Sequence, residues 1–329
     1  MAVAEGGPSA DDDEARPGAL HGVLVTYRRP VEVAEMLRRL DDQVRRLDTL
    51  VVVDNDPAAS ARAAVEAFAA RRRVGTGPRR GAAPRVSYVA TGGNAGPAGG
   101  IARGMRAVLE HAADDDWIVS LDDDDPPASA DVFARLEALG RGLRARGENV
   151  GGVGMAGGRF SPGRAQAVHV PDAELVGAVP CDWIGGNQFP CYAVRALRQV
   201  GVFDERLFFG FDDLDFGLRL AAGGWSLFAE GGLWRGARGR AGRLGDAPQP
   251  SRLVDPPSWR RYYSTRNMTY ILWQGGHRAG VARLAARALA KPLVNLPRRP
   301  TVAARHLAVD ARAIADALRD RMGLTVEPG

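Results

Sequence analysis

The 329-residue sequence has little of what several classes of protein require. Its two cysteines, Cys181 and Cys191, are ten positions apart, with no CxxC spacing and no histidine pattern nearby. A disulfide framework and a structural zinc site are therefore not expected. No apolar run reaches the roughly eighteen residues of a membrane-spanning helix, so no such helix is expected either.

Lysine is almost absent. Of the 44 basic residues only Lys291 is a lysine, and alanine and glycine are abundant. This skew is typical of high-GC coding, so a net charge of +5 and a pI near 9.7 say little about nucleic acid. Grooves that bind nucleic acid interleave aromatic with basic residues, and the arginine-rich segment 71–85 has no aromatic residue. We expect no nucleic-acid partner and interpret 71–85 as a solvated loop, with an anionic contact as the alternative.

The first residues also lack a basic stretch followed by an apolar one, the layout of a signal peptide, so a cytoplasmic location is expected. Residues 1–19 are small, acidic and interrupted by proline. Such a segment cannot bury enough apolar surface to fold, which predicts a disordered tail.

From His21 onward, strand and helix patterns alternate. Short apolar runs predict strands and helical spacing predicts helices, in the chain order 21–26, 31–47, 49–54, 58–72, 85–90, 98–112, 117–122 and 129–146. Continuous apolar strands that alternate with helices are typical of a mostly parallel sheet with helices on both faces. The sequence therefore predicts an α/β, doubly wound, Rossmann-like domain.

Beyond residue 150 the chain is rich in glycine and less periodic, until helix signals return over 193–222. Residues 236–257 are rich in Arg, Gly and Pro and are expected to form a loop. Helices are then predicted over about 258–274, 278–291 and 301–321.

Three of the four predicted strands end in polar residues. The first runs into Thr26, Tyr27, Arg28 and Arg29, the second ends at Asp54-Asn55, and the fourth ends in four aspartates, Asp122 to Asp125. Ligands of open α/β sheets bind beyond the carboxyl ends of the strands. Three such endings at one edge therefore predict a single polar site.

The aspartate run is the strongest chemical signal in the chain. Adjacent carboxylates repel one another unless a cation neutralises them or they face solvent. Asp122 and Asp124 point the same way in an extended segment and would hold Mg²⁺ or Mn²⁺, which in turn would bridge to substrate phosphates. The alternative is a solvated acidic turn that caps the next helix, but this does not explain a run joined directly to the buried strand WIVSL.

Between the third strand and its helix lies TGGNAGPAGGIARG, residues 91–104. Glycines let a backbone approach a ligand closely, and a helix N-terminus favours an anion. Arg103 would meet a phosphate there. The spacing is neither a Walker loop nor GxGxxG, so a simple tight turn stays open as the alternative.

A second acidic group lies in RLFFGFDDLDFGLRLAAGGW, residues 206–225, where Asp212, Asp213 and Asp215 stand among phenylalanines. Apolar neighbours raise the pKa of a carboxyl group and make its carboxylate a better general base. In the alternative interpretation, Asp212 or Asp213 caps a helix that runs to Ala222 and Arg219 pairs with Asp215. The two interpretations are compatible.

Taken together, these segments resemble family 2 glycosyltransferases of the GT-A fold over about residues 22–270. The matching pieces are VLVTYRRP, VVVDND, GGNAGPAGGIARG, WIVSLDDDDPP, DWIGGN, LFFGFDDLDFGLRLAAGGW and YYSTRNMTYIL. DDLDFGLR and YYSTRN are most similar to bacterial galactofuranosyl- and rhamnosyltransferases, which extend cell-wall or polysaccharide glycans.

The resemblance implies an enzyme that transfers a sugar, with inversion, from a nucleotide-diphosphate donor to an acceptor hydroxyl. UDP- or dTDP-linked sugars are the expected donors, and a glycan, a lipid-linked glycan or a small natural product the acceptor. It also implies a catalytic domain at 20–240, with a nucleotide half (20–125) and an acceptor half (126–240), followed by a loop and helical extension at 241–329.

The same resemblance assigns roles to individual residues. Asp213 would be the general base, and Asp122 and Asp124 the metal ligands of an Asp-x-Asp motif. The nucleotide-sugar site would comprise Thr26, Tyr27, Arg28, Asp54, Asn94, Arg103, Asp123 and Arg235. The acceptor site would comprise Trp183, Gly185, Gly186 and Asp212.

One position departs from the family pattern. Related proteins often have a metal-binding histidine after a tryptophan, where GLWRGAR places Arg235 beside Trp234. Arginine does not ligate metal but can neutralise a diphosphate directly. A non-catalytic protein of the same fold that binds nucleotide sugar or glycan therefore stays open as an alternative function.

The C-terminal helices allow two interpretations. Residues 278–291 and 301–321 mix arginine with Leu, Val, Ile and Ala, as a peripheral membrane helix does. Such helices would bring the protein to the inner membrane face, where a lipid-linked acceptor lies. Alternatively, the pair packs on the catalytic domain or on another subunit of a homo-oligomer.

Overall fold

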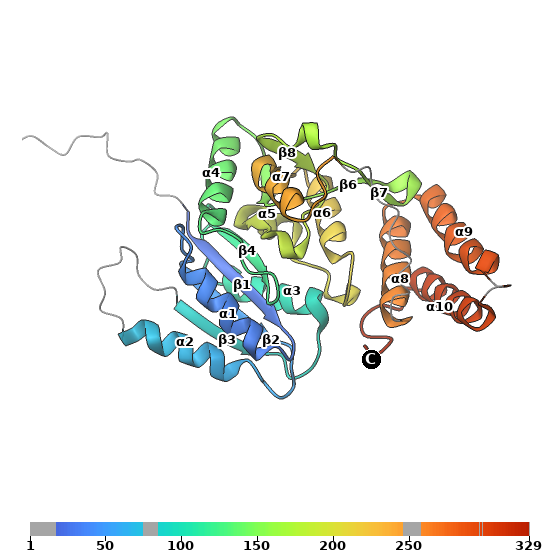
Figure 1. Ribbon diagram of the computed structural model, residues 1–329, viewed down its shortest axis with the longest axis horizontal. Coiled ribbons are helices and arrows are strands. Elements are labelled where there is room, and N and C mark those ends of the chain that lie inside the picture. The colour runs from blue at the N-terminus through green and yellow to red at the C-terminus, as the bar shows by residue number, and fades with distance from the viewer. Residues whose placement is uncertain (1–17, 75–84, 246–257, 296, 298, 329) are drawn as a thin grey trace, which may run out of the picture.

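The computed structural model describes residues 18–74, 85–245, 258–295, 297 and 299–328. Its main sheet has eight strands in the order β3-β2-β1-β4-β9-β5-β10-β8 (Figure 1). β9 and β8 run antiparallel to their neighbours, and the remaining strands are parallel. The α/β architecture expected from the sequence is confirmed, as a mixed sheet that is mostly parallel.

The strands of the main sheet are β1 (Leu20–Thr26), β2 (Thr49–Asp54), β3 (Arg85–Ala90), β4 (Trp117–Asp122), β5 (Val150–Gly154), β8 (Ala178–Cys181), β9 (Cys191–Ala193) and β10 (Ser226–Glu230). A separate hairpin is formed by β6 (Arg159–Ser161) and β7 (Gln166–Val168). The helices are α1 (Pro30–Asp41), α2 (Arg62–Val74), α3 (Gly96–Leu109), α4 (Val132–Ala145), α5 (Val194–Val200), α6 (Asp212–Ala222), α7 (Gly231–Arg240), α8 (Ser258–Gln274), α9 (Arg278–Asn295) and α10 (Pro300–Leu318).

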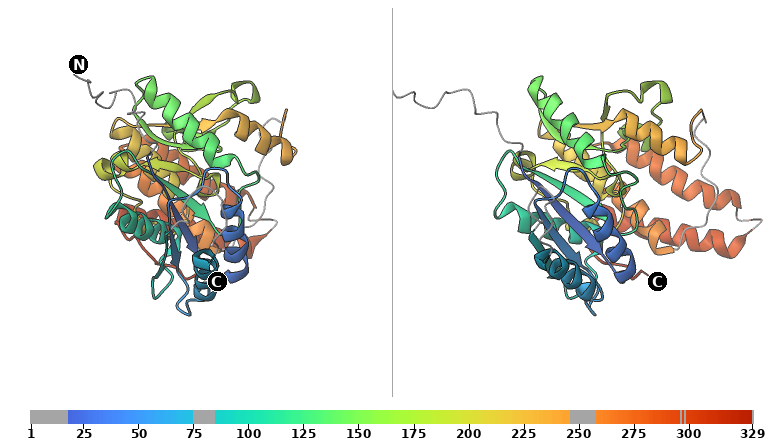
Figure 2. Two further views of the ribbon diagram at one scale, coloured as in Figure 1. Left: turned by 90° about the vertical axis from the view of Figure 1, so that its left-hand side faces the viewer. Right: turned by 60° about the vertical axis from the view of Figure 1, so that its left-hand side comes forward.

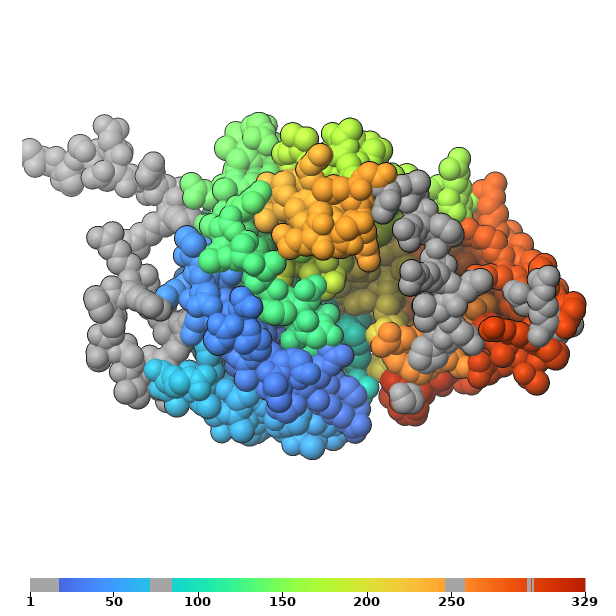
Figure 3. All heavy atoms as spheres, in the orientation of Figure 1, coloured from blue at the N-terminus to red at the C-terminus, as the bar shows by residue number. Residues whose placement is uncertain are grey.

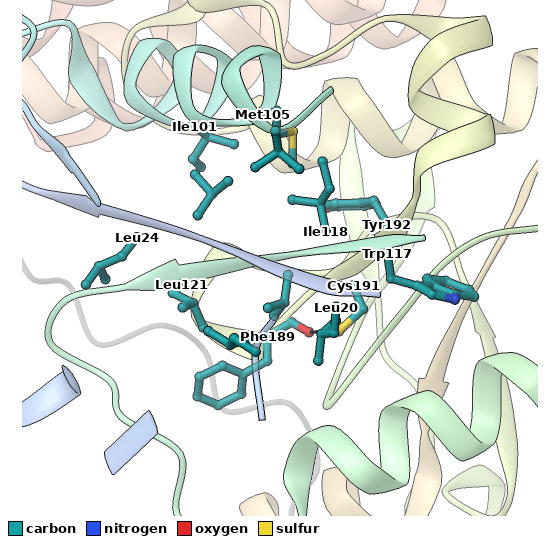
Figure 4. Close-up of a cluster of buried hydrophobic side chains, with 14 of the residues drawn as sticks. Leu20, Leu24, Ile101, Met105, Trp117, Ile118, Leu121, Phe189, Cys191 and Tyr192 are labelled. Carbon is teal, nitrogen blue, oxygen red and sulfur yellow. Dashed lines mark hydrogen bonds between the residues drawn. The ribbon is translucent and has the colours of Figure 1, made fainter. Parts of the chain in front are cut away.

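The core lies on both faces of the central strands β1 and β4 (Figure 4). Ile118 points toward Ile101 and Met105 of α3, whereas Leu121 and Leu24 point to the opposite face. This is the alternation that a strand imposes on successive side chains. Because both faces are covered, these strands read as continuous apolar runs, which is why their bounds could be predicted from the sequence.

Strands of the second half were not foreseen, and in β5 the reason is that glycines stand where apolar side chains would mark a strand. In β5, a Cβ added to Gly152 would lie 2.9 Å from the side chains of Leu227 and Tyr192, and one on Gly154 would lie 2.4 Å from Ile184. Large side chains of neighbouring elements therefore fill the space that these glycines leave. The apolar pattern is carried by the neighbours and is not visible along the strand itself.

Several expected helix bounds were wrong. The helix expected over 31–47 ends at Asp41, because Val44 leaves the helix: its amide donates to the Ala130 carbonyl and its side chain is 74% exposed. The helix expected from residue 58 begins at Arg62, because Asp54 and Asp56 bind the backbone amides of the preceding turn. The loop expected over 236–257 is helical up to Arg240, within α7.

The C-terminal helices α8, α9 and α10 pack against one another and project from the sheet domain (Figure 1, Figure 2). Arg287 of α9 donates to the backbone carbonyls of Arg164 and Ala165, beside the β6–β7 hairpin. Helix α9 therefore packs on the sheet domain, which is one of the two interpretations given above for the C-terminal helices. No helix in the described ranges is long and apolar enough to cross a membrane.

Three expectations fall wholly or partly outside the described residues. These are the tail at 1–19, the arginine-rich segment at 71–85 and the loop at 236–257, of which 1–17, 75–84 and 246–257 are not described. Ala19 is already tied to the sheet domain, since its amide donates to Asp116 and its carbonyl accepts from the Trp117 amide. Ala19 is therefore not part of a disordered tail.

Candidate active site

The first part of the site lies where β1 and β4 end side by side. The chain proceeds from β1 outward to β2 and β3 and then returns to place β4 on the other flank of β1. This reversal of strand order is the position at which open α/β sheets bind ligands. The buried Thr26 hydroxyl, at the end of β1, donates to Asp123 Oδ2 at 2.6 Å. Thr26 thus orients the acidic loop after β4.

Arg29, which was not among the expected site residues, is the arginine that reaches this acidic loop. Its guanidinium donates to Asp123 Oδ1 at 3.0 Å and also contacts Asp124. Arg28 instead points toward Asp56, with Nε 3.6 Å from the carboxylate, and lies over the Tyr27 ring. Arg28 has a positive φ of 59°, and this turn of the backbone separates the directions of the two arginines. Sequence order alone could not tell them apart.

Asp122, Asp123 and Asp124 form a group suited to a divalent cation. Each offers a carboxylate oxygen, and these oxygens lie within 4.8 Å of one another. The pKa of Asp122 is raised to about 6, first because surrounding protein displaces water from the carboxylate and then because Asp124 and Asp123 repel its charge. Asp122 keeps an exposed edge despite this. Arg29 offsets one of the three negative charges, and hard oxygen ligands with the remaining charge fit Mg²⁺ or Mn²⁺.

Asp54 has a structural use that its assigned role did not anticipate. It is fully buried and accepts hydrogen bonds from the amides of Asp56 and Ala61 and from the Tyr88 hydroxyl. Asp54 therefore shapes the loop after β2. A direct contact of its carboxylate with a nucleotide stays a prediction.

The glycine-rich turn before α3 also has mainly structural contacts. Asn94 Oδ1 accepts from the Gly96 amide, and Arg103 donates to the Thr91 carbonyl at 3.2 Å. A Cβ on Gly100 or Gly104 would collide with side chains of β1, so these glycines allow α3 to lie close to the sheet. These two glycines were expected to let the backbone approach a ligand, but in the structure they let α3 approach β1.

The second part of the site is the start of α6. Asp212 and Asp213 are its first two residues, and the capping position is Phe211. The alternative in which one of these aspartates caps the helix was therefore wrong, whereas the expected pair of Arg219 and Asp215 is present at 2.8 Å. Burial raises the pKa of both Asp212 and Asp213, and the charges of Asp213, Asp215 and Asp122 raise that of Asp212 further.

A short turn, η3 (Gly186–Gln188), connects the two parts of the site. Asn187 Nδ2 donates to Asp125 Oδ2 at 3.1 Å, which joins this turn to the acidic loop. On its other side, a Cβ on Gly185 would lie 3.7 Å from Asp213 Oδ2. The acidic loop, the Gly185–Gln188 turn and the first residues of α6 therefore form one continuous surface.

Beside this surface is a hollow of about 400 Å³. It is lined by Ala156, Gly157, Trp183, Gly185, Gln188, Trp234, Ala237, Arg238, Ala241 and Arg243. Figure 3 shows this face of the molecule, with the yellow part of the chain recessed between the green residues after β4 and the orange α7. Two of the four expected acceptor residues, Trp183 and Gly185, therefore lie at one hollow.

Arg235 lies outside the lining of the hollow. Its guanidinium donates to the Asp172 carbonyl at 3.1 Å, and its neighbour Arg238 pairs with the Asp172 carboxylate and lies over the Trp234 ring. A contact between Arg235 and a diphosphate stays a prediction. The arginine that accompanies the acidic loop is Arg29.

Comparisons with known proteins agree with this architecture. Residues 23–143 match the model described as Glycosyl transferase family 2. This segment is similar to glycosyl transferase family 2. It contains the β1 and β4 edge and the whole aspartate run, whereas Asp212 and Asp213 lie beyond its end.

Two mycobacterial proteins are similar in sequence. Galactofuranosyltransferase GlfT1 of Mycobacterium tuberculosis is 36% identical over 120 residues, which are 36% of this chain and 35% of that protein. The match thus spans about a third of the relative's length. N-acetylglucosaminyl-diphospho-decaprenol L-rhamnosyltransferase of the same organism is 27% identical over 234 residues, which cover 62% of this chain and 70% of the relative.

The fold is also found in a solved structure, that of GalNAc-T7 with UDP, GalNAc and Mn²⁺. The TM-score is 0.56 at 9% identity, over 93% of this chain and 57% of the other. Together with the family 2 domain, this confirms the expected GT-A fold.

Several residues lie at the site although the sequence analysis did not select them as functional candidates. Arg29 and Asn187 lie inside segments that had been recognised, but nothing in their order showed their direction. Trp234 had been noted only as the neighbour of Arg235, and Arg238 and Arg243 lie in a stretch without a recognisable motif. Trp234 and Arg238 reach the hollow from α7, of which residues 236–240 had been expected to be a loop, and Arg243 follows that helix.

Proposed function

We propose that this protein is an inverting glycosyltransferase that moves a sugar from a nucleotide-diphosphate donor to an acceptor hydroxyl. One observation carries the proposal. The acidic loop after β4, which suits a metal-bound diphosphate, adjoins a pair of carboxyl groups with raised pKa at the start of α6. Groups with shifted pKa values that gather beside a hollow mark a functional site.

The residues take distinct roles in this proposal. Asp213 accepts the proton of the acceptor hydroxyl as its oxygen attacks the anomeric carbon from the face opposite the diphosphate. Such an in-line displacement inverts the configuration and needs no nucleophile from the enzyme. Burial and the Asp213 charge raise the pKa of Asp212 beside the base, and Thr26 and Arg29 hold the acidic loop in place. A divalent cation held by Asp122 and Asp124 would supply positive charge to the departing diphosphate.

The donor site lies at the β1 and β4 edge. Thr26, Tyr27, Arg28 and Asp54 border this edge, and the GT-A neighbour contains UDP and Mn²⁺. A UDP- or dTDP-linked sugar is the proposed donor. Asn94 and Arg103, at the turn before α3, and Asp123, in the acidic loop, complete the proposed set of donor-site residues.

Substitution of Asp213 by Asn tests the assignment of the base. We expect Asp213→Asn to lower turnover by about 10²- to 10⁴-fold, the contribution typical of a general base, with donor affinity by calorimetry unchanged. Asp215→Asn is the matched control, because Asp215 is on the same helix and pairs with Arg219. Full activity in Asp213→Asn contradicts the assignment. Donor binding by the wild type without transfer or hydrolysis would support the non-catalytic binding protein instead.

The hollow indicates the class of acceptor. The partly exposed indole of Trp183 lines the hollow and offers an apolar surface to a sugar ring, and Arg243 offers a cation without a carboxylate partner among the described residues. One relative is named for an acceptor with a diphospho-lipid. A glycan joined through phosphate to a lipid is therefore the proposed acceptor. Arg243→Gln should raise the KM of such an acceptor and not that of the donor, and Arg240→Gln is the control. An unchanged acceptor KM would contradict this assignment.

A lipid-linked acceptor requires contact with a membrane surface, and the tip of the α9–α10 hairpin suits this. Leu293 and Val294 are 54% and 73% exposed, and Lys291 and Arg299 lie beside them. Exposed apolar side chains flanked by basic residues are typical of peripheral attachment to anionic lipid. We propose that this tip contacts the inner membrane face.

A further inference from the structure

The segment that leads into α6, residues 206–211, has a strained backbone. Phe208 and Phe211 both have a φ of 61°, and Gly210 between them has a φ of 80°. Bulky residues rarely adopt positive φ, and each such residue costs about 1–3 kcal/mol. A conformation of this kind persists only where the surrounding structure holds it. Because Asp212 follows directly, the conformation of the lead-in segment determines where the carboxylates of α6 point.

Asn267 of α8 binds this segment from one side. Its amide nitrogen donates to the carbonyls of Leu207, Phe209 and Gly210, at 2.9, 3.0 and 2.8 Å. Asn267 is fully buried, so these hydrogen bonds are shielded from water. One side chain thus fixes three carbonyls of the strained turn.

Arg266, the preceding residue, fixes the orientation of that amide. Its Nε donates to Asn267 Oδ1 at 2.9 Å, which turns the Asn267 nitrogen toward the segment. The same guanidinium, fully buried, donates to the Leu207 carbonyl at 3.0 Å and to the Gly323 carbonyl and the Thr325 hydroxyl at 2.7 and 3.0 Å. A buried cation is costly unless its donors are satisfied. The C-terminal stretch therefore completes the environment that keeps Arg266 in place.

The opposite side of the segment is closed by the family 2 domain. A Cβ on Gly96 would lie 2.2 Å from the Phe208 carbonyl oxygen, so only glycine allows α3 to begin against this turn. Asn55 in turn donates to the Gly96 carbonyl at 2.9 Å. The strained segment is thus held between the start of α3, beside the donor edge, and α8 in the C-terminal extension.

We propose that Arg266 and Asn267 are positioning residues, which hold residues 206–211 in the strained conformation that aims Asp212 and Asp213 at the acceptor. This inference rests on the proposed function, because it assigns the C-terminal helices a part in the transfer reaction. It explains why α8 and the C-terminal stretch pack on the turn before α6. Release of the turn would displace the base, and a displacement of about 1 Å costs on the order of a hundredfold in rate.

Asn267→Leu tests the proposal, because leucine keeps the volume and removes the donors. We expect a fall in kcat of about a hundredfold, unchanged donor affinity by calorimetry, and faster amide hydrogen exchange over residues 206–214. Thr325→Val, which removes one acceptor of Arg266 at a distance from the turn, should shift kcat and exchange in the same direction by less. The Thr325→Val variant keeps the proposal testable if Asn267→Leu does not fold.

Asp310→Asn is the matched control. Asp310 pairs with Arg261 between α8 and α10 and does not touch the lead-in segment. It should lower the melting temperature and leave kcat and the exchange of 206–214 unchanged. Equal losses of kcat in Asp310→Asn and Asn267→Leu, or unchanged exchange over 206–214 in Asn267→Leu, would overturn the proposal. If the wild type transfers no sugar, the proposed function fails, and the exchange measurement alone still decides whether Arg266 and Asn267 hold the turn.

Discussion

The sequence predicts which residue types form the site better than it predicts the directions in which their side chains point. The aspartate run and the Asp212-Asp213 pair were found because charged residues that follow apolar runs are informative. In the structure Arg29, which was not among the expected site residues, contacts the acidic loop, and Asp54 is enclosed within a loop. Neither fact is encoded in residue type, since both depend on backbone turns that form only with the fold. The roles assigned to these residues stay predictions.

Asp212 provides a prediction about pH. Its pKa is raised in the folded protein, so the protonated form favours folding; this contribution is present below the unfolded pKa, near 3.9, and is lost as the pH rises through the folded value. Asp212→Asn removes the titration. Its melting temperature should exceed that of the wild type at pH 8, and the difference should shrink toward pH 5.

The same variant should leave the pH dependence of turnover unchanged. The pKa of Asp213 is raised by burial and not by the Asp212 charge, so the acidic limb of the kcat profile should keep its wild-type position. Scanning calorimetry and initial rates over pH 5–8 measure the two effects. A variant that is less stable than the wild type at pH 8, or an acidic limb that shifts in either direction, would contradict the assigned electrostatics.

At the scale of elements, strands buried on both faces could be predicted to within a residue, and glycine-rich strands could not. In helices, too, a glycine allows a close contact that the sequence does not reveal. Gly217 in α6 lets the helix approach the DWIGGN segment so closely that a Cβ would lie 2.0 Å from the Asp182 carbonyl oxygen. The sequence shows a glycine inside a helix, but only the fold shows the backbone that passes over it.

Gly217→Ala should therefore destabilise the protein by more than 1 kcal/mol, because the obstructing atom belongs to a backbone and cannot move aside cheaply. Gly142→Ala in α4 is the matched control, since its nearest neighbour is a side-chain end at 3.7 Å. It should be neutral or stabilising by up to about 1 kcal/mol, the helix advantage of alanine. Urea unfolding measures both. Equal effects of the two substitutions would show that α6 and the Asp182 backbone are not in close contact.

At the scale of the whole molecule, the parallel half of the sheet followed from its alternating pattern, whereas the attachment of the C-terminal helices did not. Helical periodicity predicted their existence. It could not reveal that Asn267 binds the turn before α6, because that contact joins segments 57 to 60 residues apart in the chain.

The projecting hairpin supplies a prediction at this scale. The protein should sediment with anionic phospholipid vesicles at low salt and less so at high salt, because salt screens the attraction between exposed basic side chains and anionic lipid. Leu293→Ser with Val294→Ser should abolish sedimentation, whereas Val44→Ser, which changes an equally exposed residue after α1, should not. Sedimentation unaffected by the double substitution would remove the tip from the proposal.

The most direct test of the central claim is calorimetric titration of UDP, dTDP and GDP, each with and without Mn²⁺, into the wild type and Asp122→Asn. The account predicts that one nucleotide binds when Mn²⁺ is present, and that this binding is lost without the metal and in Asp122→Asn. If a folded wild-type protein binds none of the three under either condition, the acidic loop after β4 is not a donor site and the transferase assignment is wrong.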